Sequence, residues 1–92
     1  MSPTHNLRWY FVYFLRSQKN SSIYIGCTND LKKRIREHNH SMSYHTKKYA
    51  PWELLYFEGF RDKKDAFMRE KSLKLHAQGL RRLKERLRGT FA

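Results

Sequence analysis

Apolar residues gather in three short runs, which predict β-strands at 8–15, 22–26 and 52–58. The first run shows no polar alternation, so we expect both faces of this strand to be covered and the strand to be central in a sheet. From Trp9 to Leu15, odd-numbered residues would face one side of the sheet and even-numbered residues the other. A polar turn over 17–22 joins the first two runs and predicts an antiparallel hairpin.

Helical spacing of apolar positions predicts three helices, at about 31–38, 63–77 and 79–88. In the first of these, Leu31, Ile35 and His38 share one stripe, and Arg34 lies at the edge of that stripe, leaning over the sheet. Residues 39–50 are polar and predict a loop. The order strand, strand, helix, strand, helix, helix indicates a small α+β domain, a three-stranded, mostly antiparallel sheet flanked by helices.

The second predicted helix carries a carboxylate on its small and apolar stripe. Glu70 shares this stripe with Ala66, Leu73 and Ala77. Burial of a charge without a partner would cost several kcal/mol, so we expect a compensating group. Lys74 at i+4, Arg36 from across the fold and a bound cation are three alternatives that the sequence leaves open.

Composition and charge narrow the class of protein. The chain has 92 residues, which predicts one domain over 1–92 with a core at about 8–88. Twenty Lys and Arg against eight Asp and Glu give a net charge of +12, which favours a polyanionic partner over an acidic protein substrate. Hydrophobic residues make up 39% of the chain, too many for a disordered basic tail.

The single cysteine and the lengths of the apolar runs concern the compartment. Cys27 has no second cysteine to pair with, which excludes an internal disulfide framework and is typical of a reducing cytosol. No apolar run approaches the ~20 residues of a membrane span. The first residues lack the apolar core of a signal peptide. We therefore expect a cytoplasmic protein without membrane segments.

Four motifs recur in a fixed order along the chain. Phe11-Val12-Tyr13 is followed after ten residues by Tyr24-Ile25-Gly26, Arg34 lies ten residues beyond Tyr24, and Arg69-Glu70 follows in the second long helix. Together they resemble the GIY-YIG nuclease superfamily over about residues 8–80. The chain looks closest to the short stand-alone bacterial branch, which is similar to the N-terminal nuclease domain of the bacterial excision-repair endonuclease.

The resemblance implies a role for each matching residue. Tyr13 and Tyr24 would lie at the reactive centre beside the attacking water, and Arg34 would contact the scissile phosphate. Glu70 would hold a single divalent cation, Mg²⁺ or Mn²⁺, and His38 matches a position near the reaction. The implied activity is metal-dependent hydrolysis of DNA phosphodiester bonds, on single-stranded, branched or damaged DNA.

The chemistry of the side chains fits these roles. Arg34 offers a planar fork of donors suited to phosphate oxygens, and one carboxylate with waters and substrate oxygens can hold Mg²⁺. We take Tyr13 as the general base and Tyr24 as the residue that orients water or phosphate. A free phenol has a pKa of about 10, so a neighbour such as Arg34 would have to lower the pKa of Tyr13.

Basic residues outside these motifs supply candidate contacts to the phosphate backbone of DNA. They are Lys32, Lys33, Arg36, Lys47, Lys48, Lys74, Arg81 and Arg82. Such contacts would position the nucleic acid and make affinity depend on salt, without reading sequence. Targeting would then come from these residues, from self-association or from a partner protein.

Departures from the family pattern keep other functions open. Phe11 stands where the first motif has Gly, Cys27 where some relatives have Lys, and no Asn follows Glu70 as in some larger relatives. One alternative is a nucleic-acid-binding module with weak or no catalysis, and another is a basic adaptor on a repair or ribosomal complex. A zinc site is a weaker alternative, whose ligands would be Cys27, His38, His40 and His45.

Overall fold

A computed structural model describes residues 8–40 and 46–92 of the chain. Its three strands are β1 (Tyr10–Ser17), β2 (Ile23–Thr28) and β3 (Trp52–Phe60). They form an antiparallel sheet in the order β2-β1-β3, so the first strand is central as predicted. The predicted α+β class and the order of elements are confirmed.

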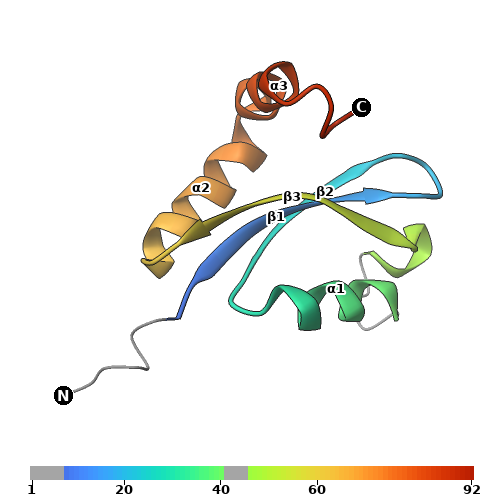
Figure 1. The fold of residues 1–92 in the computed structure, drawn as a ribbon, viewed down its shortest axis with the longest axis horizontal. Helices are drawn as coiled ribbons and strands as arrows, with labels where there is room; N and C mark the ends of the chain where they lie inside the picture. Colours follow the sequence, from blue (N-terminus) through green and yellow to red (C-terminus); the bar gives the residue numbers. More distant parts are fainter. Residues whose placement is uncertain (1–7, 41–45) are drawn as a thin grey trace.

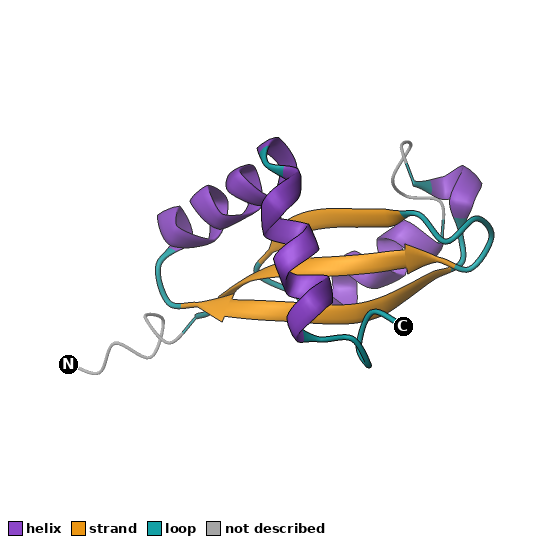
Figure 2. Cartoon of the chain, turned by 90° about the horizontal axis from the view of Figure 1, so that it is seen from above, coloured by secondary structure: helices purple, strands orange, loops and turns teal. Residues whose placement is uncertain are grey.

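Helices cover both faces of the sheet. They are α1 (Leu31–Asn39), the short 3₁₀ helix η2 (Lys47–Tyr49), α2 (Lys63–Leu75) and α3 (Ala77–Arg86). Helix α1 packs on one face, and α2 and α3 lie on the other (Figure 1). Figure 2 shows α3 crossing over the strands, with α1 behind them.

Several boundaries differ from the sequence prediction. Strand β1 extends to Ser17, because Ser17 lies opposite Trp52 in the pairing with β3. Strand β2 extends to Thr28, which lies opposite Phe11. The predicted loop at 39–50 contains η2.

The largest difference concerns the second predicted helix. It ends at Leu75, because His76 is extended with φ −124° and ψ 108°, and α3 begins at once at Ala77 instead of 79. Ala77 is therefore exposed and does not belong to the stripe of Glu70. The break lets α3 turn back over the sheet, where Leu83 is buried.

Two apolar clusters, one on each face, hold the elements together. Under α2 and α3 the buried residues are Val12, Phe14, Ile25, Ala66, Leu73 and Leu83, with Phe91 packed against them. On the α1 face, Tyr13, Leu15 and Trp52 are buried, with Leu31 and Ile35 of α1 packed against them. Each buried side chain of this kind contributes about 1.5–3 kcal/mol, so both clusters are needed for a domain of this size.

The described helices do not resemble membrane spans. None of them, over 8–40 and 46–92, combines the length and the apolar character that crossing a bilayer requires.

Candidate active site

A buried hydrogen-bond chain joins β1, α1 and the segment that precedes η2. The Tyr13 hydroxyl lies 2.9 Å from Nε2 of His38, and Nδ1 of His38 lies 2.7 Å from Oγ1 of Thr46. All three residues are buried. Because the hydroxyls can donate or accept, His38 is fully satisfied while neutral, in either tautomer. The ring of His38 is thus fixed as a partner of the Tyr13 hydroxyl.

Burial keeps this chain uncharged. Desolvation raises the pKa of Tyr13 to about 12, although Arg34 acts to lower it. Desolvation and the positive charge of Arg34 lower the pKa of His38 to about 4, partly offset by Glu37. The pKa of Tyr13 is therefore not lowered, as a simple phenolate base would require. At pH 7 only about one Tyr13 in 10⁵ would be phenolate, whereas His38 is neutral.

Tyr24 lies beside this chain on β2. Its ring centroid is 4.8 Å from that of His38 and 6.3 Å from that of Tyr13. Nζ of Lys74 lies 5.8 Å from the centroid of the Tyr24 ring. Within the described residues the Tyr24 hydroxyl has no hydrogen-bond partner, so it is available to a water or phosphate oxygen.

Arg34 lies between a carboxylate and the reactive phenol. Its guanidinium is 2.8 Å from Oε1 of Glu37, one turn further along α1, and its side chain is 33% exposed. It is also near enough to Tyr13 for each to change the pKa of the other. The pair with Glu37 is partly open to solvent, so an incoming phosphate can compete for the guanidinium.

Glu70 of α2 reaches the same region from the opposite face of the sheet. Its Oε2 accepts from Nζ of Lys74 at 2.9 Å, which resolves the alternatives in favour of the i+4 pair. Glu70 acts to raise the pKa of both Tyr13 and Cys27, which shows its proximity to both. The side chains of Glu70 and Lys74 are 20% and 48% exposed, so this ion pair is not sealed from water.

This donor set fits one hard cation held mainly by water and substrate. Within 8–40 and 46–92 no three His, Cys, Asp or Glu side chains form a metal-binding group. Mg²⁺ is often bound by one or two carboxylates with waters and phosphate oxygens, and Glu70 can serve as that carboxylate. For the zinc alternative, both ring nitrogens of His38 are engaged, and His45 lies outside the described residues.

Gly26 makes room for the Tyr13 ring. A Cβ built on Gly26 would overlap the Tyr13 hydroxyl and ring, and both residues are buried. The Tyr13 phenol thus crosses over the backbone of the edge strand β2 to reach the site. A glycine is needed here because of this close approach.

We expect Gly26→Ala to displace the Tyr13 ring and to lower the free energy of unfolding by about 1–3 kcal/mol. Urea unfolding followed by circular dichroism measures this loss. Gly89→Ala is the matched control, since a Cβ there meets nothing within 4 Å. Equal stability of the two variants would contradict the close contact.

Protonation of His38 should destabilise the fold. Because its folded pKa, about 4, lies below the unfolded value of about 6.5, the unfolded chain binds more protons between these values. The contribution of His38 is therefore complete above pH 6.5 and is lost as the pH falls to 4, a change of about 3 kcal/mol.

Urea unfolding at several pH values checks this expectation, by comparison of the wild type with His38→Gln. The difference between their pH profiles isolates His38 from the carboxylates that titrate in the same range. His76→Gln, at an exposed position, is the control. Parallel profiles for the wild type and His38→Gln would refute the buried neutral imidazole.

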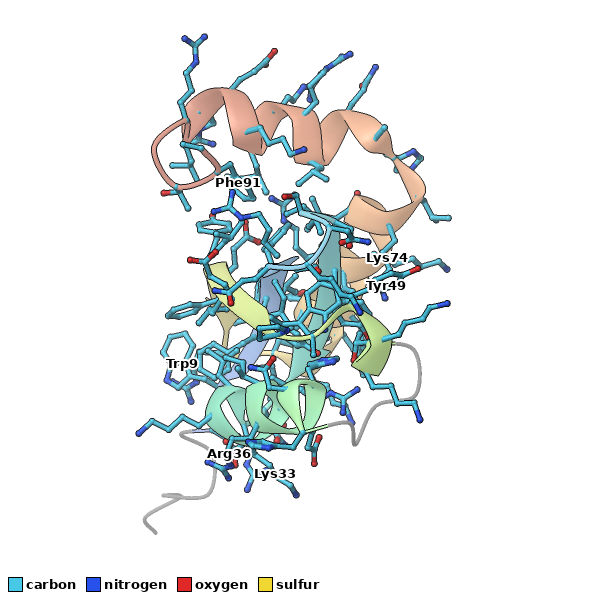
Figure 3. The ribbon with its side chains drawn as sticks, turned by 90° about the vertical axis from the view of Figure 1, so that its right-hand side faces the viewer. Trp9, Lys33, Arg36, Tyr49, Lys74 and Phe91 are labelled. Carbon is cyan, nitrogen blue, oxygen red and sulfur yellow. The ribbon has the colours of Figure 1, made fainter. Side chains whose placement is uncertain are left out.

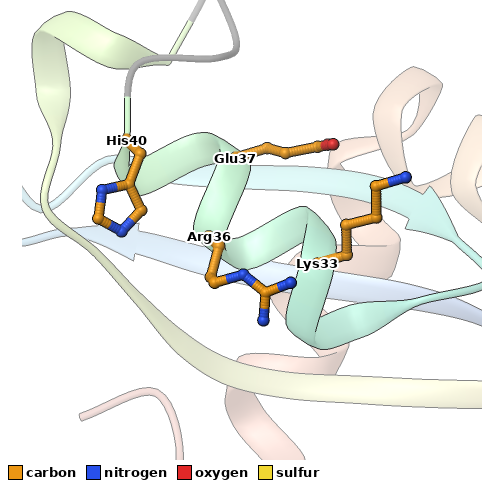
Figure 4. Close-up of a pocket in the computed structure, with 4 residues that line it drawn as sticks. All are labelled: Lys33, Arg36, Glu37 and His40. Carbon is orange, nitrogen blue, oxygen red and sulfur yellow. The ribbon is translucent and has the colours of Figure 1, made fainter.

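The predicted nucleic-acid contacts are all exposed, on two sides of the molecule. The eight residues are Lys32, Lys33, Arg36, Lys47, Lys48, Lys74, Arg81 and Arg82. Figure 3 shows Lys33 and Arg36 on the outer side of α1, with Lys74 across the sheet on α2. A hollow of about 250 Å³ on α1 is lined by Lys33, Arg36, Glu37 and His40 (Figure 4). Lys74 and Arg81 line a larger groove of about 600 Å³ between β2, α2 and α3.

Two features of the site were not predicted from the sequence. Thr46 is buried against His38, and its carbonyl accepts from Nε1 of Trp52 at 2.8 Å. Lys74, a predicted DNA contact and one of the possible partners of Glu70, also faces the ring of Tyr24. The i+4 spacing signalled the pair with Glu70, whereas no sequence signal marked the contact with Tyr24 or the place of Thr46 within its polar segment.

Comparison with known proteins agrees with this geometry. A family model described as the GIY-YIG catalytic domain matches residues 9–84. The chain is 42% identical over 65 residues to UPF0213 protein CPE1444 of Clostridium perfringens, covering 70% of this chain and 69% of that relative. It is 38% identical over 90 residues to structure-specific endonuclease subunit SLX1 of Debaryomyces hansenii, covering 89% of this chain. That alignment spans only 26% of the yeast protein.

A solved structure shows the same fold. The solution NMR structure of UPF0213 protein BH0048 from Bacillus halodurans matches with a TM-score of 0.52 and 29% sequence identity. The match covers 88% of this chain and 83% of the other. Since the family model spans most of the domain and its motif residues meet at one edge of the sheet, this chain belongs to the GIY-YIG nuclease family.

Proposed function

We propose that this protein is a metal-dependent endonuclease that hydrolyses phosphodiester bonds in DNA. The observation that carries the proposal is the meeting of Tyr13, Tyr24, His38 and Arg34 with Glu70 around the edge strand β2. Two phenols, a neutral imidazole, a guanidinium and a carboxylate from four elements serve no common packing purpose. Together they provide what phosphodiester hydrolysis requires: a proton acceptor, a phosphate contact and a cation ligand.

Proton removal from the attacking water runs through Tyr13 and His38. Tyr13 stays protonated at neutral pH, so it accepts the water proton at its oxygen while it passes its own proton to Nε2 of His38. This step uses the tautomer in which Nδ1–H of His38 donates to Thr46. The resulting imidazolium then donates from both nitrogens, and the proton later returns to solvent.

The remaining residues position the phosphate. Arg34 exchanges its solvent-exposed pair with Glu37 for the phosphate oxygens, and the Tyr24 hydroxyl orients the water or the phosphate. Glu70 would hold Mg²⁺ or Mn²⁺, which supplies charge neutralisation at the phosphate and at the leaving oxygen. Lys74 releases Glu70 for this purpose and remains near the ring of Tyr24.

The substrate and setting belong to the same proposal. The eight exposed basic residues would follow the phosphate backbone on both sides of the site, which suits single-stranded or branched DNA. The yeast relative is named a structure-specific endonuclease subunit, and we propose a structured DNA here too. We place the protein in the cytoplasm, where a free Cys27 thiol is stable, with targeting by self-association or a partner protein.

Cleavage of labelled single-stranded, duplex and branched DNA tests the proposal. With Mn²⁺ or Mg²⁺ we expect product from at least one substrate, none with chelator, and about 10²-fold slower cleavage by Arg34→Ala. Arg36→Ala is the matched control, because Arg36 lies on the outer side of α1. Salt-sensitive binding without product at enzyme excess would instead support a binding module.

A further inference from the structure

A hollow of about 220 Å³ lies beside the candidate active site. It is lined by Tyr10, Cys27, Thr28, Asn29, Lys63 and Phe67. The end of β2 and the residues that follow it form one wall, and the first two turns of α2 form the other. None of these residues has a part in the reaction proposed above.

Cys27 connects this hollow to the reaction centre. Its pKa is raised by burial and by the charge of Glu70, and the charges of Lys63 and Lys74 oppose this change. The thiol therefore lies within electrostatic range of Glu70 on one side and of Lys63 in the hollow on the other. On α2, Phe67 precedes Glu70 by three residues, which separates them by about 5 Å along the helix axis. A nucleotide whose phosphate lies at Glu70 could reach the hollow with its own or a neighbouring base.

The lining offers the groups that bind a nucleobase. Phe67 is 49% exposed, and Nζ of Lys63 lies 5.5 Å from the centroid of its ring. Asn29 is exposed, and its amide makes no hydrogen bond within the described residues. An exposed aromatic ring stacks on any base, an amide can pair with a base edge, and a lysine can approach the adjacent phosphate.

We propose that this hollow binds one unpaired base next to the scissile phosphate. This inference rests on the endonuclease function proposed above and names its substrate class. The volume is below the ~300–1,000 Å³ of pockets for drug-sized ligands, which suits a single base. A base inside a duplex is stacked and paired, so the hollow selects single-stranded, bulged or branched DNA at this position.

Binding to single-stranded oligonucleotides, each with one abasic site at a different position, tests the inference. Fluorescence anisotropy in chelator avoids any dependence on cleavage. We expect one abasic position to weaken wild-type binding about 5- to 100-fold. Phe67→Ala should weaken binding of the intact strand by a similar factor and should no longer distinguish the abasic strand.

Two further variants sharpen this test. Phe67→Leu keeps apolar bulk without an aromatic face and should behave as Phe67→Ala does. Phe57→Ala is the matched control, because Phe57 is exposed to nearly the same extent, 48% against 49%, but lies on the α1 face of the sheet. Circular dichroism and thermal unfolding of each variant confirm that the fold is retained.

Three outcomes would overturn the inference: no sensitive abasic position, full discrimination by both Phe67 variants, or loss of discrimination in Phe57→Ala as well. A change in self-association of Phe67→Ala without a change in discrimination would also overturn it, and would assign the surface to contacts between copies. Discrimination by a protein that never cleaves DNA would support the hollow and refute the endonuclease. Cleavage without discrimination would do the reverse.

Discussion

Replacement of Glu70 by glutamine should lower cation-dependent DNA cleavage by about 10³-fold, while binding measured in chelator is retained. Glutamine keeps the size of the side chain but removes the negative charge that would hold the cation. Lys74 loses its partner in this variant, but it is 48% exposed and can point into water. The fold should therefore remain intact. Single-turnover cleavage at several Mn²⁺ concentrations measures the effect.

Glu53→Gln is the control for removal of a carboxylate. Glu53 forms a surface ion pair with Arg16 at 3.3 Å, on the strand at the opposite edge of the sheet from β2. Its replacement should leave cleavage within a factor of about two, as surface pairs contribute little. Undiminished cleavage by Glu70→Gln would remove the only carboxylate that we assign to the cation.

Tyr13→Phe should reduce single-turnover cleavage by about 10²- to 10⁴-fold, the usual range for loss of a general base. It should also lower the free energy of unfolding by about 1–3 kcal/mol, because Nε2 of His38 loses its buried partner. Both effects have the same origin, the 2.9 Å hydrogen bond. Rapid-quench cleavage and urea unfolding measure them separately.

Tyr56→Phe is the control for loss of a phenol hydroxyl. The Tyr56 hydroxyl donates to Glu58 at 3.1 Å, within the other apolar cluster of the sheet. It should leave the cleavage rate unchanged. If Tyr13 and His38 act as one proton path, the double variant Tyr13→Phe/His38→Gln should cleave about as slowly as the slower single variant. Additive losses would separate the two roles.

The strands and the stripe of the first helix could be predicted because their patterns are local. Alternation along β1 correctly placed Tyr13 and Leu15 on one face and Val12 and Phe14 on the other. Helical spacing correctly placed His38 toward the sheet, where it is fully buried. Periodicity of a strand or helix follows from backbone geometry, so a sequence of this length reveals it.

Features that depend on contacts between distant segments could not be predicted. The break at His76 follows from the return of α3 to the sheet, because no proline or glycine marks that position. The high pKa of Tyr13 depends on how deeply the ring is buried, which residue type alone does not determine. The contact of Tyr13 with Gly26 requires the register of β1 against β2.

The candidate site is assembled across the sheet, and this has a consequence for its tolerance to mutation. His38 is anchored by the apolar cluster under α1, whereas Glu70 is anchored by the separate cluster under α2 and α3. A cavity made near Leu83 would loosen the cation-binding half and spare the proton-transfer half, and a cavity near Leu15 would do the opposite. Evolution or design could therefore tune metal affinity and proton transfer almost independently, with β1 as the one element that both halves share.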